Sequence, residues 1–218
     1  MSSNNRDGRS GQLDKIEYKL YWQTAKAIGI GERYIHTNLD KIDSQTKTAV
    51  EKYCDNRYYK KGIGLFITGS MGVGKTSISA YIAYRIIKSC GINCLKNDPY
   101  NTAWWTSIAK DEIRFCHSSE LHQLFRYNTN SDANNKLGKL KQVRYLIIDD
   151  FGCEFSSAYG FSQFEGFYAY RHDERFTTII NSNIPLVRLK ENSELARTFD
   201  RFRESMKVIE ITGKSLRG

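Results

Sequence analysis

One glycine-rich segment, Gly69–Thr76 (GSMGVGKT), matches the pattern G-x-x-x-x-G-K-T without interruption. An apolar stretch, Gly64–Thr68, precedes it and a helical pattern, Lys75–Ser89, follows it, which is the context in which this pattern binds phosphate. Glycines let successive backbone N–H groups converge on a phosphate, and the helix adds the positive end of its dipole. We therefore predict a nucleoside triphosphate site, with Lys75 on the β- and γ-phosphates and the Thr76 hydroxyl on Mg²⁺. The expected nucleotide contacts are Gly69, Ser70, Gly72, Val73, Gly74, Lys75, Thr76 and Ser77.

Two further apolar stretches end in polar side chains that suit chemistry on a phosphate. Tyr145–Asp150 (YLIIDD) ends in two carboxylates, and ligands bind in the crevice at the carboxyl ends of parallel strands. We expect Asp149 to hold Mg²⁺ and Asp150 to act as the general base for the attacking water. Thr177–Asn183 (TTIINSN) ends in amides, and an amide beside the γ-phosphate would orient that water without carrying charge. Either turn alone is common. The glycine-rich segment upstream favours the catalytic interpretation of the acids, and the position of the amides one strand–helix unit after the acids favours it for the amides.

Three arginines follow in the helical pattern Leu195–Arg203 (LARTFDRFR). Arginine neutralises the charge that develops on a transferred phosphoryl group, and a neighbouring subunit often supplies it. A solvent-exposed basic helix face explains the same three residues equally well.

Composition limits the classes of protein that fit the chain. With 218 residues and 40% hydrophobic side chains, the sequence suffices for one full domain with a core and an appendage. No apolar run approaches the roughly 20 residues that span a bilayer, and the polar amino terminus lacks a secretory core, so we expect a soluble, cytoplasmic protein. Lys and Arg number 33 against 24 Asp and Glu, giving a net charge of +9 that favours a polyanionic partner such as nucleic acid, although such a charge is also common on proteins that need it only for solubility.

The five cysteines are expected to be reduced thiols, because they lie far apart in a chain without a signal peptide. They are Cys54, Cys90, Cys94, Cys116 and Cys153. A zinc site is the alternative, but the spacing matches no common ligand pattern. Its candidate ligands would be Cys90, Cys94, Cys116, His117 and His122.

Short apolar runs alternate with helical patterns after Gly64, which predicts a parallel sheet covered by helices on both faces. The expected strands are Gly64–Thr68, Ile113–His117, Arg144–Asp149, Thr177–Asn181 and Met206–Ile211. The expected helices are Lys75–Ser89, Ser119–Tyr127, Phe161–His172 and Glu194–Glu204. Residues 1–9 are expected to be a disordered tail, and segment 97–110, with its two tryptophans, fits neither pattern. Leu13–Ile28 predicts an amphipathic helix that packs on the core or docks a partner.

From about Gly29 to Gly218, these residues together resemble the AAA+ ATPases of the bacterial helicase-loader type (DnaC/DnaI) and the related IstB-type transposition ATPases. The similar segments are GIGERY, GSMGVGKTS, LIIDDFG, TTIINSNIPL and ARTFDRF followed by IEITGKSLRG. The resemblance implies an α/β P-loop NTPase of the AAA+ type, with a five-stranded parallel sheet between helices. It places the ATPase domain at residues 31–218, after a tail and helix at 1–30.

The resemblance also implies roles for single residues. Asn183 would be the sensor of the γ-phosphate, since Asn181 stands where the family usually has threonine. Arg201 of the Asp-Arg pair would be the arginine finger, given in trans, with Arg197 as the reserve choice. Arg217, in the G-x-S-x-R ending, would contact the nucleotide, which the family makes ATP.

As a function, the resemblance implies an oligomeric, ATP-dependent DNA replication protein that binds single-stranded DNA and loads or remodels a replicative helicase. The DNA would follow the helix near Ser119–Tyr127, with further positive charge on Lys136, Lys139, Lys141 and Arg144. An ATPase that assists a transposase is the alternative on the same core. A small-molecule P-loop kinase is a third possibility, which the strand and helix between the two phosphate motifs disfavour.

Overall fold

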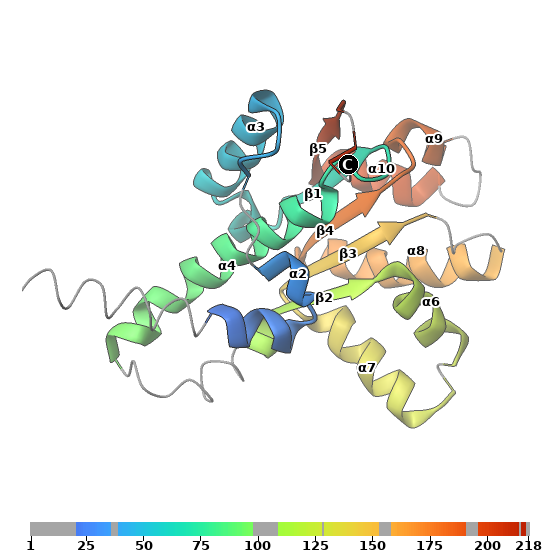
Figure 1. Cartoon of the computed structure of the whole chain (residues 1–218). Coiled ribbons are helices and arrows are strands. Elements are labelled where there is room, and N and C mark those ends of the chain that lie inside the picture. The colour runs from blue at the N-terminus through green and yellow to red at the C-terminus, as the bar shows by residue number, and fades with distance from the viewer. Residues whose placement is uncertain are drawn as a thin grey trace, which may run out of the picture.

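Five parallel strands form one sheet in the order β2-β3-β4-β1-β5 (Figure 1). The computed structural model describes residues 21–35, 39–97, 109–127, 129–152, 158–190, 196–213 and 215–216. The strands are β1 (Gly64–Gly69), β2 (Ile113–His117), β3 (Tyr145–Phe151), β4 (Thr177–Ser182) and β5 (Met206–Ile211). The predicted five-stranded parallel sheet is therefore confirmed, and every strand lies within two residues of its expected bounds.

The central strands are buried on both faces, which is why they are continuous apolar runs in the sequence. In β1, Leu65 and Ile67 enter one hydrophobic core and Phe66 enters the other, on the opposite face of the sheet. β3 alternates in the same way, with Ile147 in the first core and Leu146 in the second. Each face therefore needs its own layer of helices.

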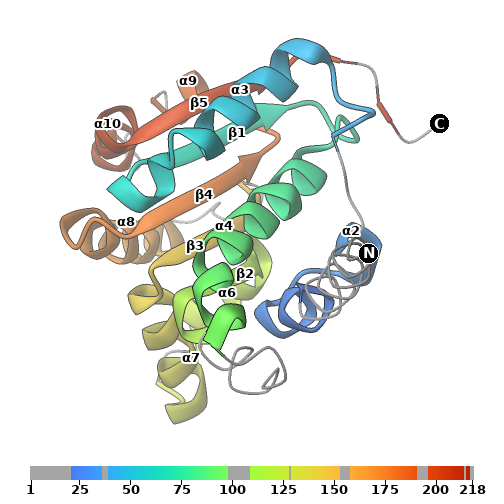
Figure 2. The ribbon, with the colours of Figure 1, turned by 90° about the vertical axis from the view of Figure 1, so that its left-hand side faces the viewer.

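Helices supply both layers (Figure 2). The first core is covered by helical residues 21–28, α2 (Glu32–Ile35), α3 (Ser44–Asp55), η1 (Tyr58–Lys61) and α4 (Lys75–Asn97). The second is covered by α6 (Ser118–Arg126), α7 (Ser131–Gln142), α8 (Ala158–Asp173), α9 (Leu186–Lys190) and α10 (Ala196–Ser205). The four helices expected after Gly64 are present, with shifted ends, whereas α2, α3, η1, α7 and α9 were not predicted.

The described part of the first predicted helix packs on the core. Residues 21–28 are helical, and Tyr21, Ala25 and Ile28 lie in the first hydrophobic core, with the Tyr21 ring 4.9 Å from the ring of Tyr84. The core interpretation is thus confirmed over these residues. The rest of that prediction, the tail at 1–9 and most of segment 97–110 lie outside the described residues.

Burial keeps the described cysteines protonated. It raises the pKa of Cys54 to about 12 and raises that of the fully buried Cys116 as well. Within the described residues, the one group of three potential metal ligands contains no cysteine. The side chains of Cys94 and Cys153 are not among those described. No helix in the described part of the chain is long and apolar enough to cross a bilayer.

One buried arginine ties the second layer of helices to the sheet. Arg171 of α8 has no exposed surface, and its guanidinium donates to the carbonyls of Leu140 (3.0 Å), Val143 (2.7 Å) and Thr177 (2.8 Å). It also donates to the Thr178 hydroxyl at 3.0 Å. Burial lowers the pKa of Arg171 to about 9, which still leaves the side chain charged at neutral pH. The positive charge meets the carbonyl end of α7, where the helix dipole is negative.

We expect Arg171→Met to lower the free energy of unfolding by about 3 kcal/mol, because several buried carbonyls lose their donor together. Urea denaturation followed by circular dichroism measures this change. The exposed Arg203→Met substitution on α10 is the matched control and should shift stability by about 0.5 kcal/mol or less. Equal stability of the two variants would contradict the role given to Arg171.

Candidate active site

The glycine-rich segment forms the loop between β1 and α4, as predicted. Gly72 and Gly74 have φ values of +83° and +100°, in the left-handed region that glycine adopts without strain. A Cβ at Gly72 would clash with the Ser215 hydroxyl, and one at Gly74 would clash with the side chain of Ile42. The backbone N–H of Leu216 donates to the Gly72 carbonyl at 2.9 Å, so the chain after β5 lies against this loop.

The Lys75 side chain is held inside the loop, with only 6% of the residue exposed. Its ammonium donates to the carbonyls of Gly69 (2.7 Å) and Ser70 (2.8 Å). It also donates to the side-chain oxygen of Asn183, at 2.6 Å, just beyond the end of β4. The structure thus brings together two residues that the sequence places 108 positions apart.

The Asp149 carboxylate is the centre of a second buried cluster. The Thr76 hydroxyl donates to both of its oxygens, at 3.1 and 3.0 Å. The Asn181 amide donates to Oδ1 at 2.5 Å, and its own oxygen accepts from the Ser79 hydroxyl at 2.8 Å. Sequence reasoning treated Asn181 only as a replacement for threonine and missed this contact, for which its place in an otherwise apolar strand is the available signal.

Burial raises the pKa of Asp149, and the neighbouring charge of Asp150 raises it further. The hydrogen bonds from Asn181 and Thr76 and the proximity of His117 act in the opposite direction. The carboxylate thus lies in a poorly solvated place, where a bound cation would gain the most from its charge.

Asp150 lies beside Asp149 but faces solvent. A register irregularity between β3 and β4, from Ile148 to Phe151, accompanies a φ of +57° at Asp150, a conformation that aspartate tolerates better than most residues. The Ser118 hydroxyl at the start of α6 donates to the Asp150 carbonyl at 2.7 Å and fixes the backbone there. Both carboxylates of the predicted pair therefore stay at the same edge of the sheet.

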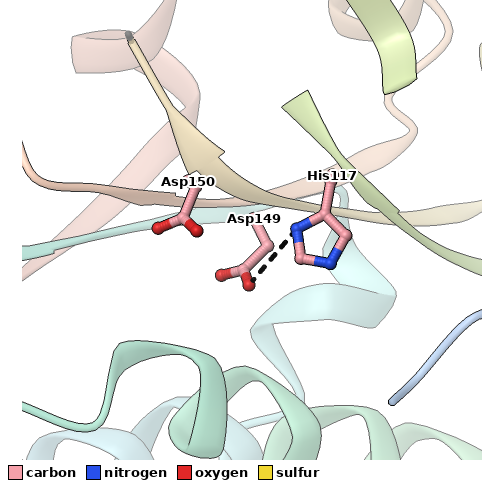
Figure 3. Close-up of side chains that lie close together, drawn as sticks. All are labelled: His117, Asp149 and Asp150. Atoms are coloured by element: carbon pink, nitrogen blue, oxygen red, sulfur yellow. Dashed lines mark ion pairs between the residues drawn. The ribbon is translucent and has the colours of Figure 1, made fainter. Parts of the chain in front are cut away.

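His117, the last residue of β2, completes this group (Figure 3). Its Nδ1 lies 3.8 Å from Oδ2 of Asp149, and the ligand atoms of His117, Asp149 and Asp150 all lie within 4.8 Å of one another. Sequence reasoning considered this histidine only with the cysteines, for zinc. The pairing of β2 with β3, which sets His117 against Asp149, is what places it here.

The arginines of α10 lie apart from this cluster. Nη1 of Arg197 and Nη1 of Arg201 lie 3.8 and 3.5 Å from the same carboxylate oxygen, Oε1 of Glu165 on α8. The Arg197 side chain is 83% exposed and that of Arg201 is 30% exposed. Arg217 lies outside the described residues.

The oxygen donors at this edge fit Mg²⁺. A hydroxyl (Thr76) and a carboxylate (Asp149) meet next to the loop, and Mg²⁺ binds one or two carboxylates together with phosphate oxygens and water. The ammonium of Lys75 and the backbone N–H groups of the loop fit the anionic part of the same ligand.

No protein-family model and no curated protein sequence matches the chain, but solved structures match its fold. A crystal structure of DnaI has a TM-score of 0.63 at 23% identity, and the match covers 87% of this chain and 95% of that one. The DnaC helicase loader gives a TM-score of 0.63 at 20% identity, over 84% of this chain and 100% of that one. The chain has the AAA+ P-loop NTPase fold.

A more distant match is the replication initiator DnaA bound to AMPPCP and single-stranded DNA. Its TM-score is 0.55 at 16% identity, and the match covers 78% of this chain but only 46% of that one. The AAA+ fold of this chain thus occurs in DnaA as one part of a longer protein.

We expect Asp149→Asn to raise the free energy of unfolding at pH 7 by about 1 kcal/mol, because the substitution removes a buried charge and keeps its shape. The asparagine oxygen still accepts from Asn181, and its amide donates to Thr76. The pKa of Asp149 is raised in the folded state, so the buried charge lowers the stability of the wild-type protein at neutral pH. This loss of stability disappears as the carboxyl becomes protonated at acid pH.

Urea denaturation of wild type and Asp149→Asn at pH 4 and pH 7 checks this prediction. The stability difference should shrink toward pH 4. The exposed Asp200→Asn substitution on α10 serves as the control and should change little at either pH. A variant that is less stable than wild type at pH 7 would show that the Asp149 charge is compensated in the folded state.

Proposed function

We propose that the chain is a Mg²⁺-dependent ATPase of DNA replication, which binds ATP on the loop Gly69–Thr76. One observation carries the proposal. The Lys75 ammonium reaches Asn183, and the Thr76 hydroxyl reaches Asp149, at the edge where β1, β3 and β4 all end. A cation, a metal-binding pair and a neutral amide are the groups that hydrolysis of a phosphoanhydride requires in one place.

In this proposal Lys75 and the loop N–H groups hold the β- and γ-phosphates of ATP. Thr76 and Asp149 hold Mg²⁺, which when bound neutralises charge on the phosphates. Asp150 takes the proton of the attacking water, and Asn183 orients that water through its amide. The water oxygen bonds to the γ-phosphorus as the bond to the β-phosphate oxygen breaks, giving ADP and inorganic phosphate.

The order of the sheet supports an ATPase over a small-molecule kinase. β4 lies between β1, which leads into the phosphate loop, and β3, which carries the acids. Asn183 follows β4 and accepts a hydrogen bond from Lys75, which supports a role for its amide in positioning water. Such kinases usually keep the two motif strands adjacent.

The proposed partners are further copies of the chain, single-stranded DNA and a replicative helicase. The fold matches to DnaI and to the DnaC helicase loader support the helicase, and the DnaA structure with single-stranded DNA supports the nucleic acid. Since neither Arg201 nor Arg197 contacts the phosphate loop of its own chain among the described residues, we propose that Arg201 acts on ATP bound to a neighbouring subunit.

We expect Lys75→Ala to weaken ATP binding by at least about 100-fold, because the main positive charge on the phosphates is removed.

Asp150→Asn should bind ATP as wild type does but hydrolyse it on the order of 100-fold more slowly, since its amide accepts no proton. Binding of a fluorescent ATP analogue and release of phosphate measure the two effects separately. Full hydrolysis by Asp150→Asn would remove Asp150 as the base.

Arg201→Ala should bind ATP normally but hydrolyse it on the order of 10³-fold more slowly, as expected when an arginine finger is lost. Mixing it with Lys75→Ala should restore part of the activity, because each mutant supplies what the other lacks at a shared site. Arg203→Ala, on the same helix, is the matched control and should retain activity. An inactive mixture would contradict an arginine acting in trans.

A further inference from the structure

Seven basic residues gather at the amino-terminal edge of the sheet, opposite the edge that carries the phosphate loop. They come from η1 and the residue before it, from the end of α7 and the turn to β3, from the turn before β4 and from the start of β5. Six are exposed and one is partly exposed. The seven are Arg57, Lys60, Lys61, Lys141, Arg144, Arg175 and Lys207.

These segments lie far apart in the sequence but are tied to one another by hydrogen bonds. The Thr177 hydroxyl donates to the Tyr59 carbonyl at 2.6 Å, and the Thr177 N–H donates to the Arg144 carbonyl at 2.9 Å. Gly62 packs directly on the backbone of Arg175. These contacts therefore hold the backbone segments that carry the basic residues in fixed positions relative to one another.

Aromatic rings lie among the cations. The ammonium groups of Lys61 and Lys207 lie 5.4 and 5.5 Å from the ring centre of Tyr58, and that of Lys141 lies 4.4 Å from the ring of Tyr170. Both tyrosines are partly exposed. Cations interleaved with accessible rings are the combination that binds a phosphate backbone and stacks its bases.

The cations of this surface are not held in ion pairs within the part of the chain that the structure describes. The nearby Asp173 pairs with His172 at 3.4 Å instead. Arg57 and Arg175 also adopt φ values of +51° and +55°, a region where glycine or asparagine would be less strained. Repulsion and strain at the same positions are costs to the folded chain that a polyanionic ligand would offset.

We propose that this edge binds single-stranded nucleic acid through its phosphates. The surface consists of turns and of the ends of helices and strands, so it presents no length of helix to enter the major groove of a duplex, whereas it suits a flexible strand. The proposal rests on the nucleic-acid partner in the proposed function and assigns that partner a surface away from the ATP site. This surface includes Lys141 and Arg144, which the sequence had suggested, but not α6.

The test compares two triple variants of the full chain with a fluorescein-labelled thirty-nucleotide oligo(dT). Lys60→Gln, Lys61→Gln and Lys207→Gln together remove three charges from the edge. Arg33→Gln, Arg126→Gln and Lys136→Gln remove three exposed charges from elsewhere and are the matched control. Fluorescence anisotropy is measured at NaCl concentrations from about 50 to about 300 mM. Melting temperatures verify that both variants fold.

The edge variant should bind the oligonucleotide at least about tenfold more weakly at low salt. A plot of the logarithm of its affinity against the logarithm of the salt concentration should have a slope that is less negative by about 2, since each lost phosphate contact contributes ~0.7. The control should stay within about twofold of wild type. Equal losses in both variants, no loss in the edge variant, or tighter binding of poly-glutamate than of oligo(dT) would overturn the proposal. Wild type that binds ATP but no DNA would overturn it while leaving the ATP site intact.

Discussion

The carboxylate of Asp149, almost fully buried at the end of β3, is the constraint on which the rest of the site depends. A buried anion requires donors, and here Thr76 at the start of α4 and Asn181 of β4 supply them. These contacts require β1, β3 and β4 to end at the same edge, which the parallel sheet with β4 between β1 and β3 provides. The same hydrogen bonds thus hold the ends of the strands together and position the side chains of the candidate site.

A second buried charge, Arg171, holds the opposite end of the sheet. Its guanidinium binds carbonyls of α7 and β4, and the basic turns around Arg144 and Arg175 are built next to these contacts. The molecule therefore has two polar ends separated by two hydrophobic cores. One end is suited to the phosphates of a nucleotide, and the other is suited to the phosphates of a nucleic acid.

Sequence alone predicted the phosphate loop and the strands well, since loop chemistry is local and buried parallel strands are unbroken apolar runs. It failed for α7, whose twelve residues bury only Leu140 and so lack an apolar stripe. Its signal was the Asn130 cap, whose side chain accepts from the Asp132 N–H at 2.9 Å. The contact of Asn181 with Asp149 and the basic edge depend on strand register and on turns distant in sequence, which no local pattern contains.

The most direct test of the account is a crystal structure of the protein with a non-hydrolysable ATP analogue and Mg²⁺. We expect the Lys75 ammonium to turn from Asn183 to the β- and γ-phosphates, with Thr76 and Asp149 facing the metal. An analogue bound elsewhere, with the hydrogen bond between Lys75 and Asn183 unchanged, would contradict the assignment of this edge as an ATP site.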